Sequence, residues 1–391
     1  MTTENSTFEL FSALLVVGIA QGVFLILAIL AAPKRPDGAN RFLAGLVSAF
    51  ALELVFRFLL ETGFLQYLPQ SLSLHWALDT WFGPLLYLYT YRLASPPAGT
   101  GDVRARKHFA IPLAATGLAI GLWALYSAPD FLAVAYASAP VPLEITEIAL
   151  ALIGLASMVF YLVKSFEVLR THRARIAQNF SYSEKVGLNW LRNLLLVVAV
   201  LLAVYVPLTV SGWFAEVFDR IYGVSIVLAV FGIGFLGIRQ PNLFVRDSVG
   251  AAEFVTDVAD DTGEAGQKYR KSALSGSEIE AIYAAIIETV DSRKLYLVSD
   301  LSLPVLADTL GLSSHYVSQA INQGSGSNFF DFINKRRVRH VAEKLRSIAS
   351  GDRVNILSIA MDAGFSSKSA FYKAFRSHMG QSPTQYRRAA L

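Results

Sequence analysis

Long apolar runs alternate with short polar stretches over the first 240 residues of the chain. Each run approaches the roughly 20 residues that a helix needs to cross the hydrocarbon core of a bilayer. The runs are Phe8–Ala32, Phe42–Leu60, Leu74–Leu93, Phe109–Tyr126, Leu143–Leu169, Trp190–Phe214 and Ile221–Gly237. Buried helices of a large soluble core are the alternative. Seven such runs joined by short loops instead favour a seven-helix transmembrane bundle.

The pattern changes after residue 240. Residues 241–275 lose the apolar periodicity and accumulate Gly, Asp, Ser and Thr, which predicts a flexible cytoplasmic linker. Residues 276–391 regain helical periodicity in short segments, starting with a capping-box spacing at Ser277 and Glu280 and an amphipathic run over Ile279–Val290. We therefore predict an all-α chain in three parts: a transmembrane domain at 1–240, a linker at 241–275, and a small helical domain at 276–391.

Composition agrees with a membrane protein and argues against an enzyme. Hydrophobic residues make up 54% of the chain and charged residues only 16%, against about 25% charged residues in soluble domains. Because there is no cysteine, disulfides, thiolate nucleophiles and cysteine-based zinc sites are excluded. The sequence also lacks the HExxH, GxSxG and glycine-rich phosphate-loop motifs. We expect no enzymatic activity, no cofactor and no metal site.

Basic residues predict the orientation in the membrane. The loops after the first, third and fifth runs carry Lys34, Arg35, Arg41, Arg92, Arg104, Arg106, Lys107, Lys164, Arg170, Arg173, Arg175 and Lys185. The alternate loops carry only Arg220. Cytoplasmic loops are enriched in Lys and Arg, so the amino terminus is expected outside and the carboxyl-terminal domain in the cytoplasm. This describes a multi-pass protein of a bacterial inner membrane.

Ionisable residues inside the apolar runs are candidates for a sensor site, because charges in a membrane are costly and often functional. Glu53 and Arg57 lie four residues apart, and so do His75 and Asp79; such pairs share one helix face. Glu144 and Glu147 open the fifth run. The alternative is a self-satisfied Glu53–Arg57 ion pair, with the other two glutamates at headgroup level.

The terminal domain contains the layout of a helix-turn-helix. Leu303–Leu310 predicts a short helix, Gly311 a tight turn, and Ser313 or Ser314 the cap of a second helix. That second helix presents His315, Ser318, Gln319 and Asn322. A long helix is expected from Asn328 to about Ser347, and its buried side carries Phe329, Phe332, Ile333, Val338, Val341, Ala342 and Leu345.

The same layout then repeats. Asn355–Ala363 predicts the short helix, Gly364 the turn, and Ser366 or Ser367 the next cap. Phe371 and Phe375 must face the core of this second unit. The opposite face therefore presents Lys368, Ser369, Tyr372, Lys373 and Arg376. From Lys335 to the end, twelve Lys and Arg face three acidic residues, a basic excess typical of phosphate binding.

The segments "LADTLGLSSHYVSQAIN", "NFFDFINKRRVRHVAEKL" and "ILSIAMDAGFSSKSAFYKAFRSHMGQSPTQYR" resemble the DNA-binding domain of the AraC/XylS family of transcription regulators. The resemblance implies two helix-turn-helix units joined by a long helix, each with a recognition helix in the major groove. It places His315, Ser318 and Gln319 at bases in the first unit. In the second unit it places Lys368, Ser369, Tyr372 and Lys373 at bases and Arg376 at a phosphate.

The first recognition helix departs from the family. Gln319 and Asn322 stand where the family usually has an Arg and then a Lys. The first unit is therefore expected either to bind weakly or to read adenine through Gln319.

Together these features predict a membrane-anchored, one-component transcription regulator that senses a signal through its transmembrane domain. Its expected partners are double-stranded promoter DNA, membrane lipid, RNA polymerase, and an unknown small-molecule or membrane signal. A homodimer is a further candidate assembly. The alternative function is a membrane transporter or receptor whose carboxyl-terminal domain is only regulatory.

Overall fold

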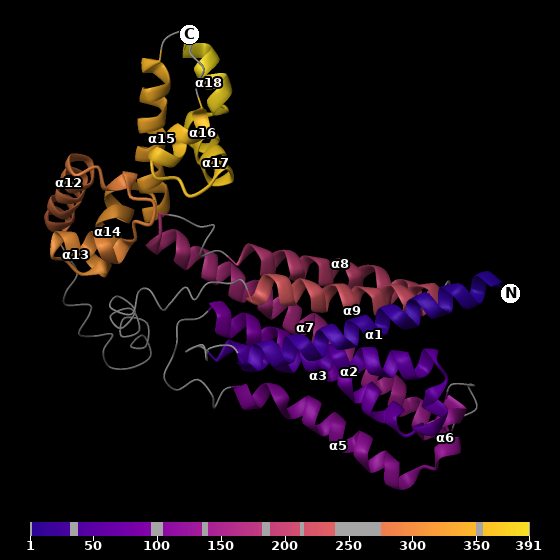
Figure 1. Cartoon of the computed structure of the whole chain (residues 1–391). Helices are drawn as coiled ribbons and strands as arrows, with labels where there is room; N and C mark the ends of the chain where they lie inside the picture. Colours follow the sequence, from indigo (N-terminus) through magenta and orange to yellow (C-terminus); the bar gives the residue numbers. More distant parts are fainter. Residues whose placement is uncertain are drawn as a thin grey trace. The chain divides into compact units, whose positions relative to one another are not determined.

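The structure, a computed structural model, describes residues 2–31, 38–94, 105–134, 140–181, 188–211, 215–238, 275–348 and 355–390. Within these ranges the regular elements are helices, apart from one isolated bridge between Phe180 and Ser302, which confirms the all-α fold class. The chain divides into two compact units (Figure 1). The first contains Met1–Leu169 and Trp190–Phe244, and the second combines Arg170–Asn189 with Val245–Leu391. The expected linker, except Ser275, lies outside the described residues.

Long helices make up the first unit. They are α1 (Thr2–Ala31), α2 (Ala39–Glu61), α3 (Ser71–Ala94), α5 (Ala110–Leu125), α7 (Val141–Asn179, whose last part belongs to the second unit), α8 (Asn189–Ser211) and α9 (Ala215–Ile238). The short elements are η1 (Phe64–Tyr67), η2 (Arg106–Phe109) and α6 (Ala128–Val134). Within the described residues, each predicted span lies almost entirely on one long helix. The stretches Leu10–Ala31, Ala39–Glu61, Arg106–Leu125 and Val141–Asn179 are long and apolar enough to cross a membrane. Shorter apolar stretches occupy α8 and α9, so seven crossings stay a prediction.

The packing of α3 explains its lower hydropathy. Most of this helix is buried, and it packs against α2 and α5. The buried hydroxyls of Ser73, Thr80 and Thr90 each donate a hydrogen bond to a backbone carbonyl. A polar group inside a bundle is tolerated when it is hydrogen-bonded. A helix whose apolar run contains His75, Asp79 and Arg92 therefore lies largely in the interior of the unit.

Apolar side chains also point outward from this unit. Phe24 on α1 is 64% exposed and Ile120 on α5 is 57% exposed, while Leu15 and Leu54 are fully buried between helices. Contiguous exposed apolar surface is unfavourable in water and is typical of a surface that meets lipid or a partner. These helices are therefore apolar on both sides, as a membrane bundle requires.

The second unit consists of two helical halves. The first half holds α12 (Gly276–Ser292), η3 (Leu295–Leu297), α13 (Leu303–Leu310) and α14 (Ser314–Ser325). The second half holds α16 (Ile356–Asp362), α17 (Lys368–Met379) and α18 (Pro383–Ala390). The long helix α15 (Phe329–Ser347) joins them, because its first turns enter one hydrophobic core and its later turns enter the other (Figure 1).

Local signals set most helix boundaries in this unit. Gly311 and Gly364 end the short helices with φ of +67° and +89°, as the predicted turns require. Ser313 and Ser367, rather than Ser314 and Ser366, cap the helices that follow. The predicted capping box at Ser277 is wrong. Ser275 instead accepts a hydrogen bond from the backbone N–H of Glu278, whose carboxylate accepts one from Ser275 N, so α12 begins earlier.

Candidate functional site

The second helix of the first helix-turn-helix layout, α14, has one buried face and one open face. Val317, Ala320 and Ile321 are fully buried, and Ser313 Oγ accepts a hydrogen bond from Tyr316 N at 3.4 Å. The predicted recognition residues lie on the remaining surface. His315 and Asn322 are exposed, and Ser318 and Gln319 are half-buried. These side chains thus share an accessible face of α14, with neutral donors and acceptors for base edges.

The corresponding helix of the second layout, α17, is built in the same way. Phe371 and Phe375 are fully buried, with ring centroids 5.6 Å apart, and Ser367 Oγ accepts a hydrogen bond from Ala370 N at 3.1 Å. The predicted residues again occupy the other face. Lys368, Ser369, Lys373 and Arg376 are exposed, and Tyr372 is half-buried. This face is cationic, in contrast to the neutral face of α14.

Arg337, which the sequence analysis did not single out, lies buried on α15 between the two halves. Its side chain is 1% exposed. Nε donates to Tyr296 O at 2.7 Å and Nη2 donates to Val298 O at 2.7 Å. Burial lowers the pKa of this guanidinium to about 10, which leaves it protonated at neutral pH. A buried charge is tolerated only when its donors are satisfied. Arg337 therefore has a structural role: it holds the carbonyls of Tyr296 and Val298 against α15. No sequence motif marks it among the basic residues of α15.

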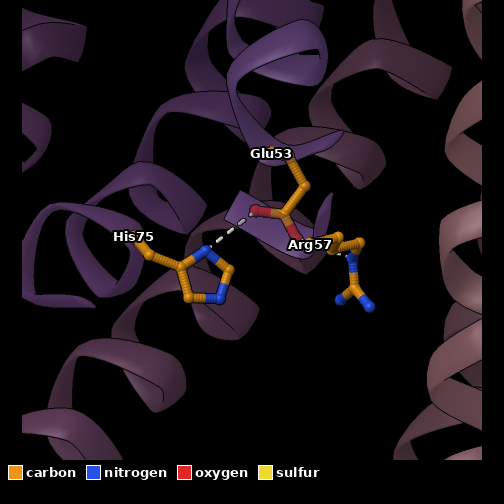
Figure 2. A network of polar contacts seen from close by, with 3 residues as sticks. All are labelled: Glu53, Arg57 and His75. Carbon is orange, nitrogen blue, oxygen red and sulfur yellow. Dashed lines mark hydrogen bonds and ion pairs between the residues drawn. The ribbon is translucent and has the colours of Figure 1, made fainter. Parts of the chain in front are cut away.

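A polar cluster in the first unit joins α2 to α3 (Figure 2). Glu53 is 1% exposed, and its Oε1 accepts a hydrogen bond from Arg57 Nε at 3.0 Å. On the other side of the carboxylate, Oε2 lies 3.0 Å from His75 Nδ1. These two atoms are close enough to form an ion pair, but they are not aligned as a hydrogen bond. The ion pair of Glu53 with Arg57, which the sequence offered as the alternative to a sensor site, is present. It is not isolated, because His75 of the next helix also contacts Glu53.

Further charged residues surround this cluster. Asp79 and Glu147 both interact electrostatically with His75, whereas Glu144 interacts with Glu147. Gly154 of α7 packs so closely on Asp79 that a Cβ there would lie 2.8 Å from Asp79 Cβ. In the part of the chain that the structure describes, no group of three or more His, Asp or Glu is arranged to hold a metal ion.

Tyr222 of α9 also contacts this cluster. The guanidinium carbon of Arg57 lies 4.5 Å from the ring centroid of Tyr222, which is a cation–π contact. Sequence reasoning missed Tyr222, because one tyrosine in an apolar run carries no distinguishing signal. The contact connects the charged residues of α2 to a third helix of the bundle.

Comparison with known proteins concerns the carboxyl-terminal part. A family model described as a helix-turn-helix domain matches residues 306–389. An uncharacterized HTH-type transcriptional regulator of Staphylococcus aureus (strain COL) is 32% identical over 100 residues, which cover 26% of this chain and 13% of that protein. The melibiose operon regulatory protein of Escherichia coli (strain K12) is 32% identical over 88 residues, 22% of this chain and 28% of that protein.

A solved structure of a protein of unknown function from Listeria innocua shares 28% identity. It covers 27% of this chain and 96% of its own, with a TM-score of 0.23. The chain thus spans only a small part of the curated relatives that it matches, and the matched part is the one with two helix-turn-helix layouts. Residues 306–389 are a helix-turn-helix domain of the AraC type.

Proposed function

We propose that the chain is a membrane-anchored, one-component transcription regulator. The observation that carries this proposal is the presence, in one chain, of an AraC-type helix-turn-helix domain and of several helices apolar enough to cross a membrane. Sensor and effector then share a polypeptide, so no diffusible messenger is needed between them. We propose domain limits at 1–240, 241–275 and 276–391, with the terminal domain in the cytoplasm.

The DNA-binding step uses the accessible faces of α14 and α17. Successive major grooves on one side of a duplex are about 34 Å apart, so two recognition helices on one domain can enter consecutive grooves. His315, Ser318, Gln319 and Asn322 contact the first groove, and Lys368, Ser369, Tyr372 and Lys373 contact the second. Arg376 neutralises a phosphate. The cationic second face supplies most of the electrostatic attraction, and the neutral first face contributes mainly through Gln319.

The sensing step uses the charged cluster around His75. Three carboxylates (Glu53, Asp79 and Glu147) interact with the imidazole of His75. Glu53 and Asp79 also interact with the guanidinium of Arg57, and Glu144 interacts with Glu147. Such an arrangement carries excess negative charge in a medium of low dielectric, which favours a proton or a cationic ligand. A signal alters DNA binding only if it binds two conformations with different affinity. The contacts of this cluster to α2, α3 and α9 provide the helices that such a change would move.

Chromatin immunoprecipitation of the full-length protein, followed by sequencing, tests the proposal. The protein is cross-linked in intact cells and recovered from the membrane fraction. We expect discrete peaks at promoters, and we expect Lys373→Ala to change the set of peaks. Lys344→Ala removes the same charge from an exposed site on α15, which is neither of the two recognition helices, and should leave the same promoters occupied. Intact membrane protein without promoter peaks would contradict the proposed function.

A further inference from the structure

The buried guanidinium of Arg337 uses all of its donors, and two of them bind a residue far away in sequence. An arginine side chain has five N–H groups. Besides Tyr296 O and Val298 O, the acceptors are Asn334 Oδ1 at 3.3 Å, Ser181 O at 3.0 Å and Ser181 Oγ at 3.0 Å. None of these five acceptors is a carboxylate. Ser181 therefore supplies two of the five acceptors that make this buried charge tolerable.

Ser181 itself is held firmly in the second unit. It is 1% exposed, and both its backbone N–H and its hydroxyl donate to Leu301 O, at 3.1 Å and 2.7 Å. The preceding residue, Phe180, forms an antiparallel bridge with Ser302. These two residues follow directly on α7, which ends at Asn179. We refer to Phe180 and Ser181 as the latch.

The latch meets the second unit where its two halves join. Arg337 binds one carbonyl of η3, Tyr296 O, and the carbonyl of Val298 directly after it. η3 contributes Leu295 and Tyr296 to the core of the first half and Leu297 to the core of the second. From the second half, Gly364 approaches so closely that a Cβ there would lie 2.7 Å from Leu297 O. The ring centroid of Phe365 lies 5.9 Å from the guanidinium carbon of Arg337. Arg337 thus binds the latch and η3 at the contact between the halves.

We propose that the latch, through Arg337, fixes the position of one helix-turn-helix half relative to the other, and so couples helix α7 to the spacing of the two recognition faces. In this role Ser181 is a positioning residue that touches no DNA. Undocking it would leave two buried N–H groups of Arg337 without acceptors, which is unfavourable, so the junction would rearrange. The consequence for DNA rests on the proposed function, because two recognition helices must match the groove spacing of a duplex.

Cysteine cross-linking of the full chain in native membranes tests whether the latch is docked. The protein has no cysteine of its own, so Phe180→Cys with Ser302→Cys introduces one pair. Residues paired across antiparallel strands have Cα atoms about 4.5–5.5 Å apart, within the range of a disulfide. We expect mild oxidation to form an intramolecular disulfide in the double variant. Each single variant is the control and should form none. Absence of the disulfide in the double variant would overturn the proposal.

Hydrogen exchange of the full chain in lipid nanodiscs tests the effect on the junction. In Ser181→Ala, amides of 295–298 and 360–366 should exchange about tenfold faster, because a buried hydrogen bond is lost at the contact between the halves. Ser165→Ala is the matched control: this hydroxyl is also buried on α7 but donates only within its own helix, to Tyr161 O. Faster exchange confined to the neighbours of residue 181, or equal exchange in both variants, would overturn the proposal.

DNA binding then tests the coupling to groove spacing. The wild-type chain in nanodiscs selects a duplex from a random library, and its affinity is compared with that for the same duplex carrying one extra base pair between the half-sites. We expect Ser181→Ala to lose most of this discrimination. The ratio of the two affinities should fall about tenfold, since the loss of one buried hydrogen bond corresponds to about one power of ten in an equilibrium constant. Unchanged discrimination would overturn the proposal. Failure of the wild-type chain to select any duplex would instead contradict the proposed function. Hydrogen exchange would still show whether the latch stabilises the junction between the two halves.

Discussion

Lys373 and Arg376 lie three residues apart on the exposed face of α17, and they are expected to contribute differently to DNA binding. A side chain that contacts a base edge changes sequence preference, whereas one that contacts a phosphate changes affinity for all sequences alike. Lys373→Ala should cost about 1–3 kcal/mol on the preferred duplex and alter the preferred bases. Arg376→Ala should weaken every duplex and reduce the slope of log K against log salt by about one.

Fluorescence anisotropy of the full chain in nanodiscs, at several salt concentrations and on two unrelated duplexes, separates these effects. Lys344→Ala is the control, because it removes an exposed positive charge from α15 and leaves the sequence of α17 unchanged. It should leave the ratio of affinities for the two duplexes unchanged. If Lys373→Ala and Arg376→Ala both bind like the wild type, α17 does not enter a groove in the proposed way.

Glu53 is the residue on which the buried cluster of the first unit depends, since it contacts both Arg57 and His75. Glu53→Gln keeps the size of the side chain and removes its charge, so the half-buried guanidinium of Arg57 loses its ion pair with Glu53. Asp79→Asn likewise removes a negative charge, from a residue that interacts with His75 and packs against Gly154. Couplings between sites usually change affinity by about 5–150-fold, and we expect promoter output to change within that range.

The measurement is a promoter reporter in cells, with membrane insertion followed by immunoblotting and DNA affinity measured on the purified chain. Glu167→Gln is the control, because Glu167 is exposed and pairs with Lys164 at 2.8 Å on the surface of α7. Wild-type output from well-inserted Glu53→Gln and Asp79→Asn would show that the cluster is structural. The signal would then act elsewhere in the chain.

Two turns of the terminal domain differ in how tightly they are packed, although both use a glycine with positive φ. Gly364, before α17, has φ of +89°, and a Cβ there would lie 2.7 Å from the carbonyl oxygen of Leu297. Gly380, after α17, has φ of +73°, and a Cβ there would meet no atom within 4 Å. Gly380→Ala should cost only the backbone strain, about 1–2 kcal/mol. Gly364→Ala adds a clash with backbone that cannot move aside, and should cost about 1–3 kcal/mol more.

Thermal unfolding of the terminal domain within the full chain, followed by limited proteolysis, ranks the two variants. Gly380→Ala serves as the matched control, since the substitution and the sign of φ are the same. Equal loss of stability in both variants would mean that the approach of Gly364 to Leu297 is not tight.

At the scale of the whole molecule, the distribution of basic residues predicts the topology. Reporters inserted at Gln70 and Asp130 should lie outside, and a reporter at the carboxyl terminus should lie inside, because Lys and Arg remain on the cytoplasmic side. Alkaline phosphatase should be active at the first two sites, and green fluorescent protein should fluoresce at the last. A fusion at Lys107 is the internal control and should behave like the carboxyl terminus. Phosphatase activity at the carboxyl terminus would contradict the proposed function as a whole.

The sequence by itself determined those features that depend on near neighbours in the chain. Leu303–Leu310 is a helix of the predicted length because Gly311 ends it, and Phe371 and Phe375 are buried because they repeat at helical spacing. Apolar periodicity, turn glycines and capping serines act over a few residues, so they can be read without a fold. Even here one boundary was ambiguous: both Ser275 and Ser277 precede a glutamate by three residues, and only the structure shows that Ser275 forms the box.

Only the tertiary structure decided which distant residues meet. His75 joins Glu53 from the next helix, Tyr222 covers Arg57 from α9, and Ser181 binds Arg337 across 156 positions of sequence. No local pattern marks these contacts, because they result from the free energy of packing whole helices and of satisfying buried charges, to which many residues contribute at once. The buried guanidinium of Arg337 illustrates this, because its sequence context resembles that of any exposed arginine on α15. Asn334 is its neighbour on the same helix, but the other four acceptors are brought to it only by the folded unit.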